Sequence, residues 1–427
     1  MNRDDVVARD AADPLTPLRE LFALPEGTIY LDGNSLGALP RATAGRVAEV
    51  VTEEWGRGLI ESWNTADWIG LPQRVGDKVA RLVGAGPGEV VVADSTSLNV
   101  YKVLASALSI AASDAPERRI VVSERSNFPT DLYIASSLCR DRGYELVLVD
   151  SPEEIEGLLD RAAVLMLTEV NYRTGYLHDM AAVTARAHEH GVLAVWDLCH
   201  SAGAVPVDLG GADADFAVGC GYKFLNGGPG SPAFLWVNPR HVDRFEQPLS
   251  GWMGHAAPFE MSPGYRPAEG VSRYLSGTPG IIGISALECG VDTLLAAEAY
   301  GGLEAIREKS LALTRLFADL VASRLPGFTI ESPLDDAQRG SQLSLSVDEG
   351  AYAIVQALIE RGVIGDFRAG SIASGSASAG SPDILRFGVT PLYTRYVDVW
   401  DAVDHLVSVM DNDEWRDERF WTRGAVT

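Results

Sequence analysis

The chain has 427 residues, which is too long for one hydrophobic core, so we expect two packed domains and not a small binding module. It carries 59 acidic and 35 basic residues, and the net charge of −24 argues against nucleic acid as a partner. Hydrophobic residues make up 46% and charged residues 22%, a mixture typical of globular proteins and not of disordered ones.

The four cysteines are widely spaced, and none forms a CxxC pair. We therefore expect neither a disulfide framework nor a metal site. The first residues lack an apolar signal core, and no apolar run approaches the roughly 18 residues of a membrane-spanning helix. The sequence predicts a cytoplasmic protein with no membrane partner.

Short apolar runs alternate with helical stretches from about residue 85. The helical stretches include Thr130–Arg142 and Met180–His190. Continuous Val/Leu/Ala runs between amphipathic helices are typical of a mostly parallel sheet covered on both faces. We predict a large α/β domain over 61–290 whose sheet has seven strands. The runs are Glu89–Ala93, Arg119–Ser123, Tyr144–Val149, Ala163–Thr168, Val192–Asp197, Phe216–Cys220 and Ala233–Val237.

The remaining segments predict a smaller α+β domain over 291–427, to which residues 1–60 contribute. The N-terminal segment reads as a strand at Ile29–Leu31 and a helix over Pro40–Trp55. The predicted C-terminal elements are helices over Glu304–Leu325 and Tyr352–Arg361 and strands near Phe328–Ser332 and Ser341–Val347. The Gly/Ser-rich segment Arg368–Asp383 predicts a flexible loop.

Polar residues at the ends of two successive apolar runs are the strongest functional signal, because open α/β sheets bind ligands beyond the carboxyl ends of their strands. Asp197 ends one run and is followed by His200, and Tyr222-Lys223 follow the next. An acid followed 26 residues later by a lysine is typical of a pyridoxal phosphate site. The aldehyde of that cofactor needs an amine, and its ring nitrogen needs a carboxylate that keeps it protonated.

Each of these residues also has a simpler interpretation. A strand-end Asp is often a cap, and a lysine is usually a solvated surface charge. Here Lys223 lies between an apolar strand and the Gly-rich segment Phe224–Gly230, which lets a cofactor approach closely. Asp197, Lys223 and the Gly-rich segment together therefore favour a cofactor site over a helix cap and a surface charge.

Two other segments match the needs of the cofactor. Thr96 and Ser97 follow a strand and precede a helical stretch, so they offer hydroxyls and backbone N–H groups to a phosphate, although they also fit simple helix caps. Phe128 follows another strand and fits a ring that covers the pyridine face. Core packing is the alternative for Phe128.

With these residues the chain resembles the kynureninase family over nearly its whole length. Members of this family are pyridoxal-phosphate enzymes of the aspartate-aminotransferase fold type. The segments Asn127–Asp131 and Gly251–Trp252 are more selective than those around the Asp, His and Lys, which related class V enzymes share. The matching segments are Tyr30–Gly37, Asn127–Asp131, Trp196–Gly203, Gly221–Gly230, Gly251–Trp252, Ser276–Pro279 and Leu385–Phe387.

The resemblance implies roles for individual residues. Lys223 would bind the cofactor covalently, Asp197 would pair with its ring nitrogen, and Tyr222 would act as acid and base or only bind the phosphate. The other cofactor-binding residues would be Thr96, Ser97, Phe128, Asp131, Thr168, His200, Trp252 and Thr278, with Trp252 and Thr278 reaching in from a second subunit of a homodimer. Arg386 would bind the substrate carboxylate through two hydrogen bonds, beside the substrate-binding residues Asn34, Ser35 and Trp63.

The implied reaction is hydrolysis of L-kynurenine to anthranilate and L-alanine, in tryptophan degradation and NAD precursor metabolism. Trp63 and Thr278 stand where animal enzymes that favour 3-hydroxykynurenine carry His and Asn, so the chain resembles the bacterial branch, which favours kynurenine. A core or interface position is the alternative for Trp63.

Other function classes fit less well. A cysteine desulfurase shares the Asp, His and Lys but needs a nucleophilic cysteine late in the chain, and residues 290–427 contain none. A DNA-binding regulator would need a basic face. A serine hydrolase would need a GxSxG segment after a strand. The dinucleotide-like spacing of Gly228–Ala233 precedes a strand and does not follow one.

Overall fold

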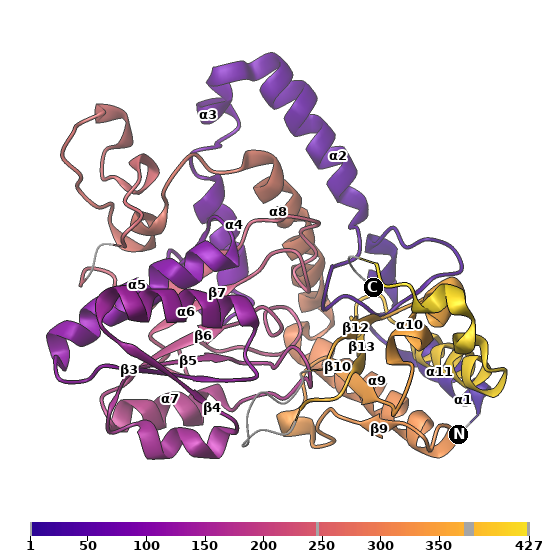
Figure 1. Cartoon of the computed structure of the whole chain (residues 1–427). Helices are drawn as coiled ribbons and strands as arrows, with labels where there is room; N and C mark the ends of the chain where they lie inside the picture. The colour runs from indigo at the N-terminus through magenta and orange to yellow at the C-terminus, as the bar shows by residue number, and fades with distance from the viewer. Residues whose placement is uncertain (1, 245–246, 371–379, 425–427) are drawn as a thin grey trace. The chain divides into compact units, whose positions relative to one another are not determined.

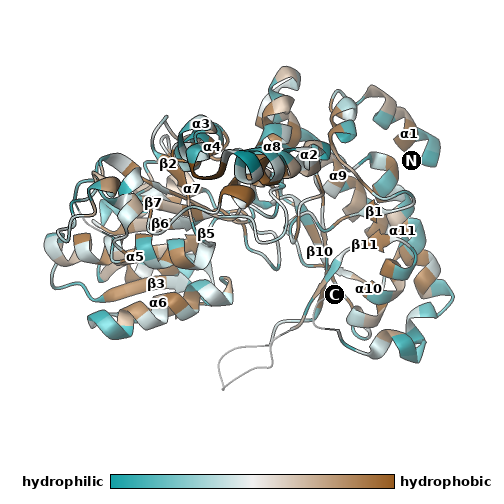
Figure 2. Ribbon diagram, turned by 90° about the horizontal axis from the view of Figure 1, so that it is seen from above, coloured by the Kyte–Doolittle hydropathy of each residue, from teal (hydrophilic) through white to brown (hydrophobic). Residues whose placement is uncertain are grey.

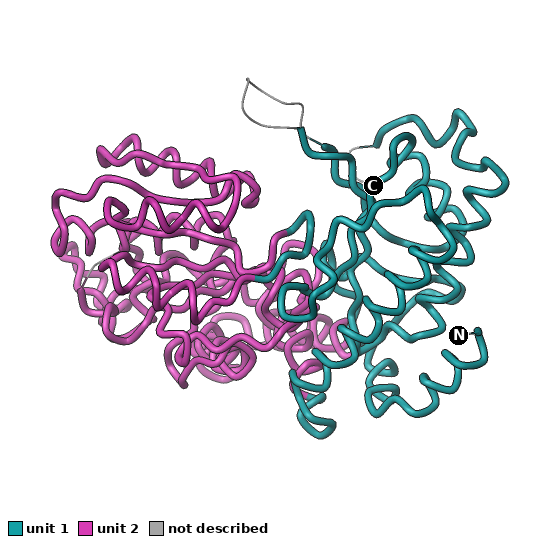
Figure 3. The backbone as a smooth tube through the Cα atoms, turned by 90° about the horizontal axis from the view of Figure 1, so that it is seen from below, with its two compact units in different colours: residues 1–41, 172–177, 296–427 teal, residues 42–171, 178–295 magenta. Residues whose placement is uncertain are grey.

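The computed structural model describes residues 2–244, 247–370 and 380–424 (Figure 1). The chain forms two compact units, drawn in different colours in Figure 3. Unit 1 comprises Met1–Arg41, Tyr172–Leu177 and Ala296–Thr427, and unit 2 comprises Ala42–Asn171 and His178–Leu295. These bounds differ from the predicted division at 60/61 and 290/291, because residues 42–60 and 291–295 belong to unit 2 and the short segment 172–177 belongs to unit 1.

A seven-stranded sheet forms the centre of unit 2, and each of the seven predicted runs overlaps one of its strands. β8 is antiparallel to both of its neighbours, and the other neighbouring pairs are parallel. The prediction of a mostly parallel α/β sheet is confirmed. In spatial order the strands are β2 (Val90–Val92), β8 (Phe234–Val237), β7 (Phe216–Gly219), β6 (Leu193–Asp197), β5 (Ala162–Thr168), β3 (Ile120–Glu124) and β4 (Glu145–Val149).

Helices cover the sheet, as its uninterrupted apolar strands require. Figure 1 shows α5 and α6 on one side of the sheet and α7 on the other. In Figure 2, β3 has the hydrophobic colour, whereas α6 is mixed, as expected of a covering helix. The helices of this unit are α2 (Arg41–Glu49), which continues as a π-helix over Val50–Gly58, α3 (Ser62–Thr65), α4 (Leu71–Ala80), α5 (Thr96–Asp114), α6 (Pro129–Arg142), α7 (Met180–Glu189) and α8 (Ile281–Leu295).

Unit 1 is an α+β unit with a four-stranded antiparallel sheet in the order β12-β13-β10-β9. A separate pair of short strands, β1 and β11, is parallel. The strands are β1 (Ile29–Tyr30), β9 (Thr329–Ile330), β10 (Gln342–Ser346), β11 (Val363–Ile364), β12 (Asp366–Arg368) and β13 (Ile384–Gly388). The helices are α1 (Arg3–Ala12), α9 (Gly302–Arg324), α10 (Ala351–Glu360) and α11 (Tyr396–Asp411).

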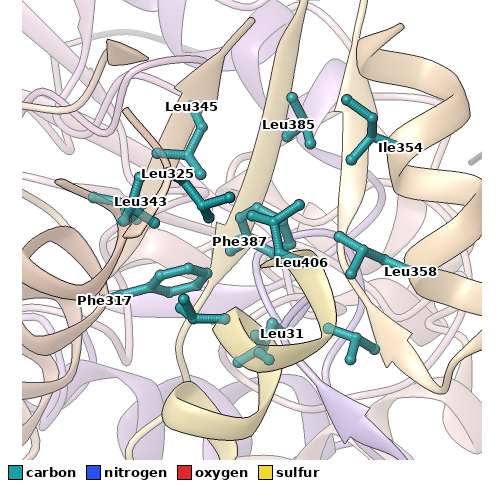
Figure 4. Close-up of a cluster of buried hydrophobic side chains, with 14 of the residues drawn as sticks. Leu31, Phe317, Leu325, Leu343, Leu345, Ile354, Leu358, Leu385, Phe387 and Leu406 are labelled. Atoms are coloured by element: carbon teal, nitrogen blue, oxygen red, sulfur yellow. The ribbon is translucent and has the colours of Figure 1, made fainter. Parts of the chain in front are cut away.

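The core of unit 1 joins its N-terminal and C-terminal segments. Figure 4 shows Leu31 and Phe317 grouped with side chains of β10, β13, α10 and α11. The strands and helices predicted between residues 304 and 361 are found, whereas α1 and α11 were not predicted. Of the predicted loop Arg368–Asp383, residues 371–379 lie outside the described residues. None of the described helices has the length and apolar composition needed to cross a membrane.

A buried carboxylate ties β6 and β7 together at the edge of the sheet opposite the strand-end residues predicted above. Asp215, directly before β7, is 1% exposed, and its Oδ2 accepts a hydrogen bond from the backbone N–H of Ala194 at 2.7 Å. The same carboxylate lies 2.9 Å from His188 Nε2, 2.7 Å from His241 Nε2 and 2.6 Å from Arg240 Nη2. Burial opposes ionisation, but the hydrogen bonds of His188 and His241 outweigh it and lower the pKa of Asp215.

Asp215→Asn is expected to lower the free energy of unfolding by about 3 kcal/mol, because the mutation leaves buried cationic and imidazole groups without their carboxylate. Urea titration followed by circular dichroism measures the change. Asp213→Asn is the matched control, since the Asp213 side chain is 62% exposed and pairs with Arg240 at the surface. We expect the control to cost less than about 1 kcal/mol. Equal losses in the two variants would contradict a special role for Asp215.

Candidate active site

The predicted strand-end residues lie along one edge of the sheet of unit 2. Thr168 ends β5 and Asp197 ends β6, and the two are direct partners in the parallel ladder. Lys223 follows β7, which is parallel to β6. Because the carboxyl ends of parallel strands share an edge, residues far apart in sequence are brought together here.

Lys223 is a buried lysine and not a surface charge, since it is only 9% exposed. Its Nζ lies 2.9 Å from Nε2 of His200, and it lies 5.8 Å from the ring centroid of Phe128 and 5.5 Å from that of Tyr222. The amine is therefore enclosed by one imidazole and two aromatic rings. Such an amine is sheltered from bulk water and placed to react with a carbonyl group.

Phe128 does not pack into the core, because 41% of its surface is exposed. It is the residue preceding α6, and its backbone is extended there. The neighbouring Asn127 fixes this turn: its Oδ1 accepts a hydrogen bond from Thr168 Oγ1, and its Nδ2 donates to Ser123 Oγ at 3.2 Å. An exposed ring held beside a buried amine offers a flat surface on which a planar group can stack.

Two carboxyl groups, those of Asp131 and Asp197, are buried next to this amine. They are 3% and 4% exposed, and Asp197 Oδ1 accepts a hydrogen bond from the backbone N–H of Cys199 at 2.7 Å. Burial, followed by the negative charge of Asp197, raises the pKa of Asp131 well above its ordinary value. Oδ2 of Asp131 is buried and accepts no hydrogen bond from any described residue. A hydrogen-bond donor from outside the described residues would satisfy this oxygen.

The N-terminus of α5 provides the features of an anion site. Ser95 is the N-cap residue, and Thr96 and Ser97 form the first helical positions. Thr96 Oγ1 lies 3.6 Å from Cys199 Sγ, which places this helix end beside the turn that follows β6. Free backbone N–H groups, two hydroxyls and the positive end of a 19-residue helix fit a phosphate group.

Tyr222 is a proton donor at neutral pH. It is partly buried, and burial raises the pKa of its hydroxyl to about 12, against the opposing positive charge of Lys223. The phenol therefore stays protonated while it lies next to the amine.

The other predicted residues of unit 2 lie in separate segments. Trp252 begins a short helix over Trp252–Gly254, and its ring packs edge-on against Phe259 with centroids 5.6 Å apart. Thr278 lines a cavity of about 200 Å³ together with Asp94 and Gly230. That these residues serve a second subunit remains a prediction. Trp63 packs edge-on against Trp68 at 5.9 Å and touches the hydrophobic core, as the core alternative predicts.

Arg386, Asn34 and Ser35 lie together in unit 1. Arg386 is 1% exposed, donates from Nη2 to Ser35 Oγ at 2.8 Å, and donates from Nη1 to the carbonyl oxygen of Tyr172 at 2.6 Å. The amide of Asn34, oriented to satisfy both of its polar atoms, accepts from Arg386 Nε at 3.1 Å and donates to Asp32 Oδ1 at 3.3 Å. The predicted substrate-binding residues of this unit thus form one hydrogen-bonded group.

Sequence reasoning missed two members of this group, Asp366 and Arg368. Asp366 is the register partner of Arg386 across β12 and β13, and it forms ion pairs with Arg386 at 2.5 Å and with Arg368 at 2.6 Å. Burial, followed by the negative charge of Asp366, raises the pKa of Asp32 to about 7. The only signal in the sequence was the charged-apolar-charged pattern of residues 366–368, which is common at strand edges.

Comparisons with known proteins identify relatives of the whole chain. The family described as "Kynureninase C-terminal domain" matches residues 306–406. A kynureninase of Burkholderia pseudomallei (strain K96243) is 56% identical over 430 aligned residues, covering 100% of this chain and 99% of the relative. A kynureninase of Pseudomonas fluorescens is 53% identical over the same share of both chains.

Solved structures share the fold at much lower identity. A cysteine desulfurase from Thermococcus onnurineus NA1 superposes with a TM-score of 0.75 at 18% identity, over 93% of this chain and 97% of the other. A C-DES variant with glycine covalently linked to its PLP cofactor gives a TM-score of 0.78 at 16% identity, over 91% and 98%. These similarities show the fold alone.

Asp131→Asn is expected to raise the melting temperature of the cofactor-free protein at pH 8 by about 2 °C or more, because it removes a carboxyl group whose ionisation is opposed by burial and by Asp197. A carboxyl whose pKa is raised by folding gives its full stability only below the ordinary Asp pKa, and that stability is lost as the pH rises through the folded value. The gain in melting temperature should therefore be smaller at pH 5 than at pH 8. Scanning calorimetry at both pH values tests this, and a constant or negative difference would contradict it.

Proposed function

Because the chain belongs to the kynureninase family, we propose that it hydrolyses L-kynurenine to anthranilate and L-alanine with pyridoxal 5'-phosphate as its cofactor. The observation that carries this proposal is the buried amine of Lys223 next to the buried carboxyl pair Asp131 and Asp197. 3-Hydroxy-L-kynurenine is a second candidate substrate of the same reaction. The pathway context we propose is tryptophan degradation.

The residues of unit 2 fit this cofactor part by part. Lys223 would hold its aldehyde carbon, Phe128 would stack on its ring, and Thr96 and Ser97 at the start of α5 would bind its phosphate. Asp197 would hold its ring nitrogen. Thr168 and His200 would line the ring from the same strand ends, and Trp252 and Thr278 of a second subunit would complete the phosphate site.

When bound, the cofactor supplies a carbonyl group for the substrate amine and a cationic ring that accepts electrons from the substrate carbon atoms. The residues of the chain move the protons. Lys223 would remove the α-proton of the substrate, and Asp197 would keep the ring nitrogen protonated.

Water then adds to the γ-carbonyl of the substrate, and the bond between the β and γ carbons breaks. Tyr222, protonated at neutral pH, would donate a proton to the carbonyl oxygen and recover it as the carboxyl group of anthranilate forms. The β-carbon gains a proton and leaves as part of alanine. Arg386 would hold the substrate carboxylate throughout.

A cysteine desulfurase is the alternative that the shared fold raises. That chemistry requires a reactive thiol on an accessible loop. Here Cys139, Cys199 and Cys220 are buried and Cys289 is partly buried, and burial raises the pKa of Cys139 to about 11. No cysteine follows residue 289 in the sequence. The cysteines and the kynureninase relatives therefore both favour kynurenine hydrolysis over cysteine desulfuration.

We further propose that two copies of the chain form a homodimer that shares its active sites. Several large apolar side chains are exposed along and after the π-helix, including Trp55 at 57%, Leu59 at 60% and Ile60 at 76%. A group of exposed apolar residues of this size fits a subunit interface. The cytoplasmic location stays a prediction.

The proposed function is tested by incubating the purified holoenzyme with L-kynurenine while following the fluorescence of anthranilate, with 3-hydroxykynurenine in parallel. We expect anthranilate and alanine in equal amounts. Failure to release either product would refute the proposal.

Lys223→Ala is expected to abolish turnover of L-kynurenine and the visible absorbance of the covalently bound cofactor, because the mutation removes the buried amine. Absorbance spectroscopy of the reconstituted variant, together with the anthranilate assay, measures both effects. Steady-state turnover in this variant would show that another residue holds the cofactor.

Tyr222→Phe separates the two roles considered for Tyr222. If the phenol moves protons, kcat should fall by a factor of about 10² or more with cofactor affinity nearly unchanged. If it only binds phosphate, the dissociation constant of the cofactor should rise and kcat at saturating cofactor should stay near that of the wild type. We expect the first result, measured by steady-state kinetics over a range of cofactor concentrations.

A further inference from the structure

Asp366 is the centre of the charged group in unit 1. It is 1% exposed and lies opposite Arg386 in the register of β12 and β13. Its Oδ1 accepts from Arg386 Nε at 2.8 Å and its Oδ2 from Arg386 Nη2 at 2.5 Å. Its Oδ2 also lies 2.6 Å from Arg368 Nη2 and accepts from Ser35 Oγ at 2.7 Å. One carboxylate thus holds two guanidinium groups and a hydroxyl.

The contacts of Arg386 use most of its donors. Asp366 takes the edge formed by Nε and Nη2, Ser35 takes the second hydrogen of Nη2, and the carbonyl oxygen of Tyr172 takes one hydrogen of Nη1. Among the described residues, the second hydrogen of Nη1 has no acceptor. The guanidinium plane is therefore fixed by Asp366 on one edge, and one N–H of Nη1 is left for a ligand, where two hydrogen bonds to the substrate carboxylate were expected.

We propose that Asp366 is a positioning residue that orients Arg386 and thereby sets the preference of the enzyme for a substrate with a free carboxylate. The proposal rests on the proposed function to the extent that Arg386 binds the carboxylate of the amino-acid substrate. In this proposal Asp366 acts through its hydrogen bonds to Arg386.

The charges of the group agree with this role. Arg386 and Arg368 contribute two positive charges, and Asp366 contributes one negative charge. Asp32, whose pKa is raised to about 7 by burial and then by Asp366, is only partly ionised at neutral pH. The group is therefore short of negative charge, and one further carboxylate brings it close to neutrality. Arg368 also lines a cavity of about 580 Å³ with Ser35, Asp32 and Asp366, so its guanidinium faces a space that a ligand can enter.

The test compares Asp366→Asn with the wild-type holoenzyme. Asparagine keeps the shape but faces the guanidinium with an amide N–H₂, so the plane of Arg386 tilts. We expect KM for L-kynurenine to rise at least tenfold while kcat changes less than about threefold, because the lost interaction serves substrate and transition state alike. Titration calorimetry should show the binding of L-alanine weakened about tenfold and that of L-alaninamide unchanged.

Two further variants make the result specific. Ser35→Ala removes the hydroxyl shared by Asp366 and Arg386 with little loss of packing, and should shift the preference for alanine over alaninamide in the same direction by about threefold. Asp398→Asn is the matched control, because Asp398 is also buried in unit 1 and pairs with Arg19 and Arg395. It should lower thermal stability without changing that preference.

An unchanged preference for alanine over alaninamide in folded Asp366→Asn and Ser35→Ala would overturn the proposal, as would an equal change in the Asp398→Asn control. The calorimetric arm does not depend on kynurenine. If the wild type fails to hydrolyse L-kynurenine but the variants lose the preference for the free carboxylate, then the proposed function fails and the role of Asp366 stands.

Discussion

The parallel pairing of β5, β6 and β7 is the constraint on which the candidate active site depends. It brings Thr168, Asp197 and the turn carrying Lys223 to one edge of a sheet whose strands are otherwise apolar. Buried ionisable groups are costly to fold unless they are paired with groups of opposite charge. The sheet contributes the rigidity that holds an amine and two carboxyl groups in a small volume.

The two units solve the same electrostatic problem in different ways. In unit 2 the buried carboxyl of Asp131 has an oxygen without a donor among the described residues, which leaves it available to a donor from a ligand. In unit 1 the buried carboxylate of Asp366 is saturated by two guanidinium groups and a hydroxyl. In the first arrangement a buried oxygen lacks a hydrogen-bond donor, whereas in the second the carboxylate fixes the positions of two guanidinium groups.

Much of the fold was predictable because its strongest signals are local. The seven strands are continuous apolar runs, and Lys223 and Asp197 stand directly at the ends of two of them. α11 was not predicted, although Val399, Val403 and Leu406 have helical spacing. Asp366 was not predictable in the same way. Its partner Arg386 is 20 residues away and is selected by strand pairing, which no spacing in the sequence specifies.

The path of the chain through the two units has a consequence for biosynthesis. Unit 1 is assembled from three stretches of sequence, and β1 near residue 30 finds its partner β11 only beyond residue 360. During translation, unit 2 is complete once residue 295 has left the ribosome, while the first 41 residues still lack their partners. Apolar side chains such as Val6 and Leu31, which are fully buried in the finished protein, must wait exposed until the last quarter of the chain is made. The N-terminal segment thus reaches its folded environment only after synthesis of the chain is nearly finished.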